Sequence, residues 1–203
     1  MKVFIALLVI LCAAAHASGA SAAPPSSRLT APEGVLSWTV SITADGVAVS
    51  GRSPEWTVEH TAAPDLTPRS TMRTDADGST VTVVYGPKAT TVTLPSKTIT
   101  HERADLWDAD TFDVRLGDRV ARRQSTDFAF DALDPASGKV YGFTAETVGE
   151  EACGTKACRR VKVRLAGVLK MLGPKWEFWF APSGQLMRFK GPLGDFVAEG
   201  VSR

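Results

Sequence analysis

The spacing of the cysteines decides whether they can form a disulfide, a redox pair or a metal site. Beyond residue 23 the chain has two of them, Cys153 and Cys158, separated by four residues that include Gly154. Because the flanking segments are strand-like, we expect a disulfide across a tight hairpin in an oxidising compartment. Free thiols are the alternative. A redox pair would need C-x-x-C beside a helix, and a structural zinc ion would need four ligands.

The two histidines beyond residue 23, His60 and His101, have no partner at metal-ligand spacing. His101 precedes Glu102, but the second histidine that completes a zinc-binding helix is missing. The chain also lacks a G-x-S-x-G nucleophile elbow and a glycine-rich phosphate loop. We therefore expect no catalytic residue, no metal and no cofactor, and we predict that the protein is not an enzyme.

Four aspartates cluster in the middle of the chain, at Asp105, Asp108, Asp110 and Asp113. Two of them could serve a hydrolase that uses paired acids. Calcium binding is a further alternative, although the glycine and distal glutamate of an EF-hand are missing. Asp108 precedes a helical pattern and Asp110 falls in its first turn, so helix capping and solvation are the expected roles.

The segment from Lys175 to Phe180 is unusually rich in aromatic residues. In a strand, Trp176, Phe178 and Phe180 share one face and Trp179 lies on the other. One face is expected to build the core, and the apolar residue on the other suggests a sheet that is covered on both sides. We take six residues of this strand and its partner as candidate ligand-binding residues, with core packing as the alternative: Trp176, Phe178, Trp179, Phe180, Met187 and Phe189.

Residues 1–23 have the layout of a secretory signal peptide. Lys2 precedes an apolar run from Val3 to Ala15, and Ala20-Ser21-Ala22 fits the rule for a small-residue cleavage site. We therefore expect a periplasmic or secreted bacterial protein. Lipid attachment at Cys12 is the alternative, but Leu11 stands where lipoprotein signals have a small residue.

The secondary structure expected after the signal is dominated by strands. Residues 24–34 predict a linker rich in proline and serine, and from Val35 onward apolar and polar residues alternate. This alternation predicts about eleven strands. One helix is expected after Asp108, where Phe112, Leu116 and Val120 are four residues apart. A strand is the alternative there, because Gly117 lies inside the pattern.

Composition and charge narrow the function classes. The chain has 203 residues, of which 44% are hydrophobic and 22% charged, as in ordinary globular proteins. Without Lys2, the basic and acidic residues balance. A net charge near zero offers no footprint for nucleic acid and no polybasic membrane anchor. The predicted fold is mainly β, a single domain over 35–203 with one curved antiparallel sheet or half-barrel and a single short helix.

Several motifs between Leu94 and Gly194 carry a resemblance to known proteins. They are Trp-Asp-Ala-Asp-Thr-Phe at 107–112, Asp-Phe-Ala-Phe-Asp at 127–131, Gly-Lys-Val-Tyr at 138–141, Val-Gly-Glu-Glu at 148–151, Trp-Glu-Phe-Trp-Phe at 176–180 and Leu-Met-Arg-Phe-Lys-Gly at 186–191. This half of the chain resembles a group of uncharacterised secreted bacterial proteins of β-rich, half-barrel type. Such proteins are similar in architecture to periplasmic carriers of lipids and lipoproteins. The resemblance implies a carrier-like shape and assigns a role to no residue.

Two hypotheses for the function follow from these observations. In the first, an exported envelope protein binds an apolar ligand, such as a lipid or an acyl chain, in its curved sheet. In the second, the same sheet has a filled core and no ligand, and the protein has a structural or interaction role in the envelope. The expected partners are accordingly a lipid or other apolar small molecule, or an envelope protein. Nucleic acid is not an expected partner, and no later segment is apolar for long enough to span a membrane.

Overall fold

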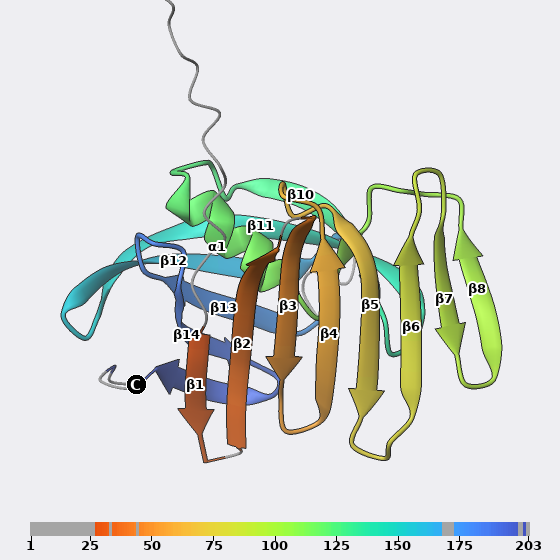
Figure 1. The fold of residues 1–203 in the computed structure, drawn as a ribbon. Helices are drawn as coiled ribbons and strands as arrows, with labels where there is room; N and C mark the ends of the chain where they lie inside the picture. The colour runs from red at the N-terminus through yellow and green to blue at the C-terminus, as the bar shows by residue number, and fades with distance from the viewer. Residues whose placement is uncertain (1–26, 33, 44, 168–172, 199–200, 202–203) are drawn as a thin grey trace, which may run out of the picture.

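The computed structural model describes residues 27–32, 34–43, 45–167, 173–198 and 201. Within these ranges it has one sheet of fifteen strands and one helix (Figure 1). The predicted signal peptide and Cys12 lie outside the described residues. In chain order the elements are β1 (Ser27–Ala31), β2 (Gly34–Thr43), β3 (Gly46–Arg52), β4 (Trp56–Ala62), β5 (Pro68–Asp75), β6 (Thr80–Tyr85), β7 (Thr90–Leu94), β8 (Lys97–His101), β9 (Trp107–Asp108), α1 (Phe112–Ala121), β10 (Phe128–Asp134), β11 (Lys139–Cys153), β12 (Lys156–Leu165), β13 (Lys175–Phe180), β14 (Leu186–Gly191) and β15 (Gly194–Ala198).

The sheet is largely an antiparallel meander that is joined to itself at one point. Its order is β8-β7-β6-β5-β4-β3-β2-β1-β15-β14-β13-β12-β11-β10-β9. Strand β1 pairs with β2 on one side and with β15 on the other, so that the first and last strands of the sequence meet in its middle. The short strand β9 pairs with β10 in parallel. The prediction of a mainly β fold with one curved antiparallel sheet and a single short helix is confirmed.

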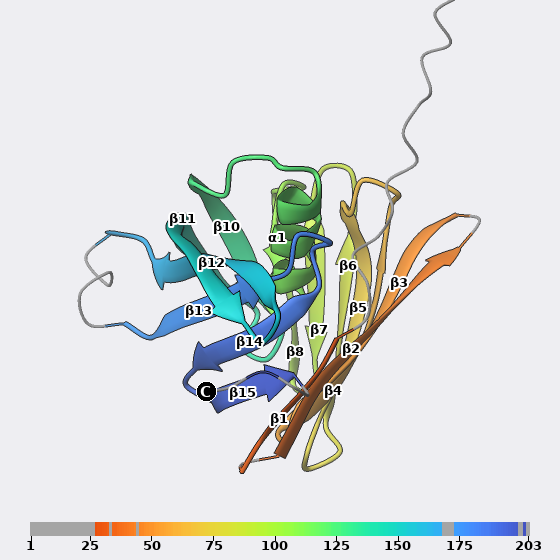
Figure 2. The ribbon, with the colours of Figure 1, turned by 90° about the vertical axis from the view of Figure 1, so that its left-hand side faces the viewer.

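The curved sheet forms two arms that enclose the helix. Figure 2 shows β2–β8, here called the N-terminal arm, diverging from β10–β14, the C-terminal arm, with α1 between them and β1 and β15 where they meet. Aromatic and aliphatic side chains from both arms and from α1 form the main core. At the far end the arms approach each other again, where Leu106 and Leu133 pack with Val81 and Val83 of β6.

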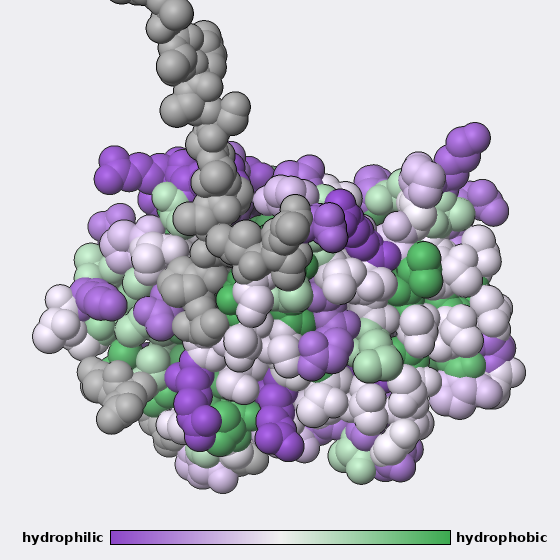
Figure 3. Space-filling view, viewed as in Figure 1, coloured by the Kyte–Doolittle hydropathy of each residue, from purple (hydrophilic) through white to green (hydrophobic). Residues whose placement is uncertain are grey.

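Alternation explains which residues of the strands are buried. In β4, alternate residues from Trp56 to Ala62 are buried and those between them are exposed. The outer face of the N-terminal arm carries threonines, such as Thr80 and Thr82 of β6, which are exposed. This face is turned toward the viewer in Figure 3, where most of it is pale, neither strongly hydrophilic nor strongly hydrophobic.

The helix packs so closely on the β13–β14 turn that it requires glycine. Phe112, Leu116 and Val120 are buried, as the predicted spacing requires, and the strand alternative is wrong. A Cβ atom on Gly117 would collide with the carbonyl oxygen of Gly184 in that turn. Gly184 itself has φ of +82°, a conformation that favours glycine. Gly117 therefore weakens the helical propensity of the sequence but permits this contact.

Three strands were not predicted from the sequence. Ser27–Ala31, which falls in the predicted linker 24–34, is β1, because its backbone pairs with both β2 and β15. Lys97–His101 is the edge strand β8, and Trp107–Asp108 is β9. Asp108, the predicted helix cap, belongs to β9, and the helix begins four residues later with Thr111 at its N-cap position.

Candidate functional site

The candidate site is a cavity of about 450 Å³ between the two arms. Strand β2, the start of α1 and the inward faces of β11 and β13 all contribute to its wall. Most of the lining is apolar and much of it aromatic, and three of the lining residues are aspartates. The lining residues are Leu36, Trp38, Trp56, Ala109, Asp110, Phe112, Asp113, Asp134, Tyr141, Phe143, Leu165, Pro174, Trp176, Phe178, Leu186, Phe189 and Leu193.

Aromatic rings in contact give the cavity a rigid wall. Phe112, at the first position of α1, has its ring centroid 5.8 Å from that of Phe143 and 5.7 Å from that of Phe178. Phe143 contacts Trp176 edge to face at 5.7 Å, and Phe178 lies 5.2 Å from Phe189. Such separations are typical of stabilising aromatic pairs. The helix is thereby fixed to the C-terminal arm on one side of the cavity.

The structure divides the six predicted ligand-binding residues between two faces of the sheet. Trp176, Phe178 and Phe189 line the cavity. Phe180 points to the same side but is almost fully buried in the main core, near Gly117 of the helix. Trp179 and Met187 lie on the opposite face, in a separate cluster with the cysteines. The cavity thus contains half of the predicted set, together with Trp38 and Trp56 of the N-terminal arm, which the sequence analysis did not single out.

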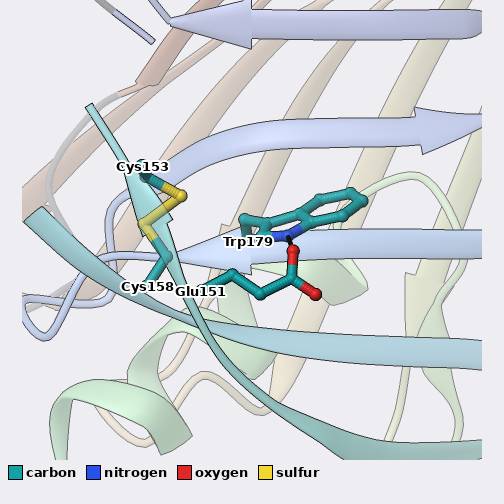
Figure 4. Close-up of a disulfide and its surroundings, with 4 residues drawn as sticks. All are labelled: Glu151, Cys153, Cys158 and Trp179. Carbon is teal, nitrogen blue, oxygen red and sulfur yellow. Dashed lines mark hydrogen bonds between the residues drawn. A yellow bond between two sulfur atoms is a disulfide. The ribbon is translucent and has the colours of Figure 1, made fainter. Parts of the chain in front are cut away.

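The opposite face of β13 is covered by the disulfide hairpin. Cys153 and Cys158 form a disulfide between the ends of β11 and β12, with Cα atoms 5.8 Å apart. Figure 4 shows it beside Trp179, whose indole N–H donates a hydrogen bond of 2.9 Å to Glu151. The guanidinium groups of Arg160 and Arg188 lie 5.2 and 4.7 Å from the centre of the Trp179 ring. Trp179 is therefore packed within the chain itself, and the disulfide fits an extracytoplasmic protein.

Three carboxyl groups line the cavity, each from a different structural setting. Asp110 precedes the helix and accepts hydrogen bonds of 2.9 and 3.0 Å from Nη1 of Arg73 in β5. Asp134 ends β10 and accepts a hydrogen bond of 2.6 Å from the Ser137 hydroxyl in the following turn. Asp113 lies in the first turn of α1, where the helix dipole favours a negative charge. The cavity is apolar over most of its wall and acidic at these three positions.

Burial is the main influence on the acidic side chains at the start of the helix. Desolvation raises the pKa of Asp113 to about 7, although hydrogen bonds from its own backbone and that of Val114 oppose the rise. Desolvation and then the charge of Asp108 raise the pKa of Asp110 to about 7, against the attraction of Arg73. At neutral pH the carboxyl groups of Asp110 and Asp113 are therefore partly protonated.

A raised carboxyl pKa makes the stability of the folded state depend on pH. Because the pKa of Asp113 rises from 3.8 to about 7 on folding, the folded protein binds more protons than the unfolded chain between these values. The contribution of Asp113 to the free energy of unfolding should therefore fall as pH rises through this window. Burial lowers the pKa of His60, which has the opposite effect below 6.5. The change must accordingly be measured as a difference between the parent and Asp113→Asn.

We expect the Asp113→Asn variant to gain stability relative to the parent as pH rises from about 4 to 7, and to keep a constant advantage above that. Urea unfolding followed by circular dichroism at each pH measures this difference. Asp77→Asn, in an exposed turn, is the matched control and should show no such trend. A parent–variant difference that is independent of pH would contradict the buried state of Asp113.

A second polar cluster connects the N-terminal arm to β9. Asp108 of β9 accepts hydrogen bonds from the hydroxyl groups of Thr71 at 2.6 Å and Tyr85 at 2.7 Å. Its other oxygen accepts a bond of 2.9 Å from the backbone N–H of Asp110. Because Thr71 donates to Asp108, it accepts from Nδ1 of His60, 2.8 Å away. The four side chains are buried, so this cluster holds the N-terminal arm to the segment that precedes the helix.

Sequence reasoning placed Asp108 at the helix start and treated His60 as an isolated side chain. Alternation in β5 and β6 could have placed Thr71 and Tyr85 on the inward face. No local pattern connects either residue with Asp108, which lies 37 and 23 residues away in the chain. Contacts of this kind depend on how the two arms meet.

No family model matches the chain, and no curated protein matches it. Among solved structures, the chain is similar to the crystal structure of a β-barrel-like protein of domain of unknown function DUF1849 from Brucella abortus. The two share 13% sequence identity with a TM-score of 0.49, over 84% of this chain and 90% of that chain. That protein is bacterial, and the likeness assigns no ligand and no functional residue to this chain.

Proposed function

We propose that this protein is an exported envelope protein that binds an apolar ligand, such as a lipid or an acyl chain, in the cavity between its two arms. The observation that carries the proposal is the cavity of about 450 Å³ with a mostly apolar and aromatic wall. Its volume lies within the range of about 300–1,000 Å³ that is usual for small-molecule sites.

The wall of the cavity supports an apolar ligand over a hydrophilic one. Leu36, Leu165 and Leu193 add aliphatic surface to the aromatic rings of Trp176 and Phe178. Water forms few hydrogen bonds with such a surface. An acyl chain that covers the wall removes apolar surface from water, and this burial is favourable by about 25 cal/mol per Å². The phenylalanines that contact one another need no rearrangement to form this surface, so little ordering of side chains would oppose binding.

A location outside the cytoplasm is part of this proposal. The Cys153–Cys158 disulfide is of a kind that persists in oxidising compartments. The pattern of residues 1–23 predicts a secretory signal. Within the described ranges, no helix combines the length and the apolar character that crossing a bilayer requires. The disulfide and the signal pattern favour a periplasmic or secreted protein.

Native mass spectrometry of the mature protein, purified from a bacterial periplasm without detergent, tests the proposal. We expect a mass excess that solvent extraction releases as lipid, which would also identify the ligand class. A mass that stays bare after incubation with lipids would overturn the proposal. It would favour the alternative, an envelope structural or interaction protein with a filled core and no ligand.

Trp176 and Trp179 lie three positions apart on opposite faces of β13, so variants of the two compare the cavity wall with the face away from it. Trp176→Ala removes a ring from the cavity wall, and we expect the Kd for a fluorescent acyl probe to rise at least about tenfold from the lost apolar contact. Trp179→Phe changes a ring on the opposite face, and we expect the Kd to stay within about twofold. Probe titration of both variants, after circular dichroism has established folding, measures the two values. Equal losses in both variants would place the binding site elsewhere.

A further inference from the structure

Among the residues that the structure describes, the charged groups that line the cavity are all acidic. Asp110, Asp113 and Asp134 belong to the wall, and among the described lining residues there is no lysine, arginine or histidine. Arg73 approaches from behind the wall, where it is shared between Asp110 and Asp75. The Arg73 guanidinium is therefore already paired with two carboxyl groups and is not available to pair with a bound anion. Asp113 has no ion-pair partner of this kind among the described residues.

Aromatic rings in the same wall offer a second feature that attracts positive charge. Trp38, Trp56 and Trp176 line the cavity together with Tyr141. The negative face of an indole attracts a cation within about 6 Å of its centre. The protein already uses this interaction beside the cavity, where the Arg73 guanidinium lies 5.3 Å from the Trp56 ring. Carboxyl groups and tryptophan rings around one space form the kind of environment that receives ammonium groups.

We infer, building on the proposed function, that the cavity selects amphiphiles with a cationic ammonium head group over those with an anionic head group. An ammonium group bound beside Asp113 can pair with its carboxylate and contact the faces of the tryptophan rings in the wall. A carboxylate or phosphate head group in the same place meets carboxyl groups, and none of the described lining residues offers it a cation. Burying an anion without a partner is strongly unfavourable. The cost of burying such a head group would therefore offset much of the favourable free energy from burying the acyl chain.

The electrostatics of Asp113 support this selection. Burial without an adjacent cation raises the pKa of its carboxyl group to about 7. A bound ammonium group would favour the ionised form and draw the pKa back down. Proton release on binding a cationic amphiphile near pH 6 is therefore expected, and a neutral amphiphile should release none.

Three probes that share one chain and differ only in the head group test the inference. Dodecyltrimethylammonium, the glycerol ester of dodecanoic acid and dodecanoate are titrated into the mature protein by isothermal calorimetry at pH 7.5, each below its micelle concentration. We expect the ammonium probe to bind at least about tenfold more tightly than dodecanoate, with the neutral ester between them.

Variants locate the effect in the cavity. Asp113→Asn should reduce the preference for ammonium over dodecanoate to about threefold or less, and Asp77→Asn, in an exposed turn, should leave it unchanged. Asp134→Asn serves as a second lining variant if Asp113→Asn does not fold. Trp176→Ala should weaken all three probes. Ammonium binding that is undiminished in Trp176→Ala would mean binding to the acidic surface outside the cavity, and would overturn the inference.

The outcomes separate this inference from the function on which it rests. Binding of the neutral ester with equal or tighter binding of dodecanoate would overturn the head-group selection and leave an apolar-ligand site in place. Absence of binding by all three probes would overturn the proposed function as well.

Discussion

Replacing Asp108 with alanine is expected to lower the free energy of unfolding by about 3–5 kcal/mol, because it leaves buried hydrogen-bond donors without a partner. Thr71, Tyr85 and the backbone of Asp110 all donate to this carboxylate, which is itself only 1% exposed. Since the side-chain donors come from β5 and β6 and the acceptor from β9, the loss also removes a connection between distant parts of the sheet.

The Asp108→Ala result can be separated from a general effect of removing charge. Tyr85→Phe removes one of the donors and the need to satisfy it, so a loss of about 1 kcal/mol is expected. Asp77→Asn, in an exposed turn, should cost less than about 0.5 kcal/mol. Urea unfolding followed by circular dichroism measures all three. A loss below 1 kcal/mol for Asp108→Ala would contradict the role given to this buried cluster.

Replacing Gly117 with alanine is expected to destabilise the protein, although alanine is the better helix former. Helix propensity alone predicts a gain of about 1 kcal/mol. The new methyl group, however, would collide with the carbonyl oxygen of Gly184 and would lie 3.4 Å from the Phe180 ring. Overpacking of this kind typically costs about 1–3 kcal/mol, and here it falls on backbone atoms, which have little room to move.

Two substitutions of increasing size at position 117 test whether close packing or helix propensity determines the change in stability. We expect Gly117→Ala to lower the melting temperature and Gly117→Val to lower it further, because the larger side chain must displace the β13–β14 turn from the helix. Differential scanning calorimetry gives the order directly. A rise in melting temperature for Gly117→Ala would mean that the helix and the turn do not touch as described.

The strands that sequence reasoning found were those with several alternating residues. Strand β12 buries Val161 and Val163 between charged neighbours. This alternation can be recognised from the short stretch of sequence that forms the strand. The missed strands lack it: β8 contains one strongly apolar residue, Ile99, and β9 is two residues long. Strand β1 owes its existence to pairing partners at both of its edges, which no local pattern can reveal. Gly117 made the helix look less favourable in the sequence, because the contact that requires glycine is with Gly184, in a turn that is distant along the chain.

The site was predicted in part. Alternation placed Trp176 and Phe178 on one face and Trp179 on the other, as the structure has them. Periodicity could not tell which face borders a cavity, because that depends on the separation of two arms that meet only in the folded chain. Trp38 belongs to the wall for this reason, and its ring fits because Gly51, opposite it on β3, leaves the space of a side chain free. The three carboxyl groups likewise come together from the turn before α1, from α1 itself and from the end of β10.

The position of β1 determines the order in which this sheet can be completed. Its register pairs Leu29 with Leu36 on one side and with Ala198 on the other. The first partner lies seven residues further along the chain, whereas the second lies 169 residues further. The N-terminal arm can therefore form early, but the inner edge of β1 stays open until Ala198 has been made, and such late pairing slows folding. A nascent chain would carry this unpaired strand edge until then, which is a natural point of capture for a chaperone.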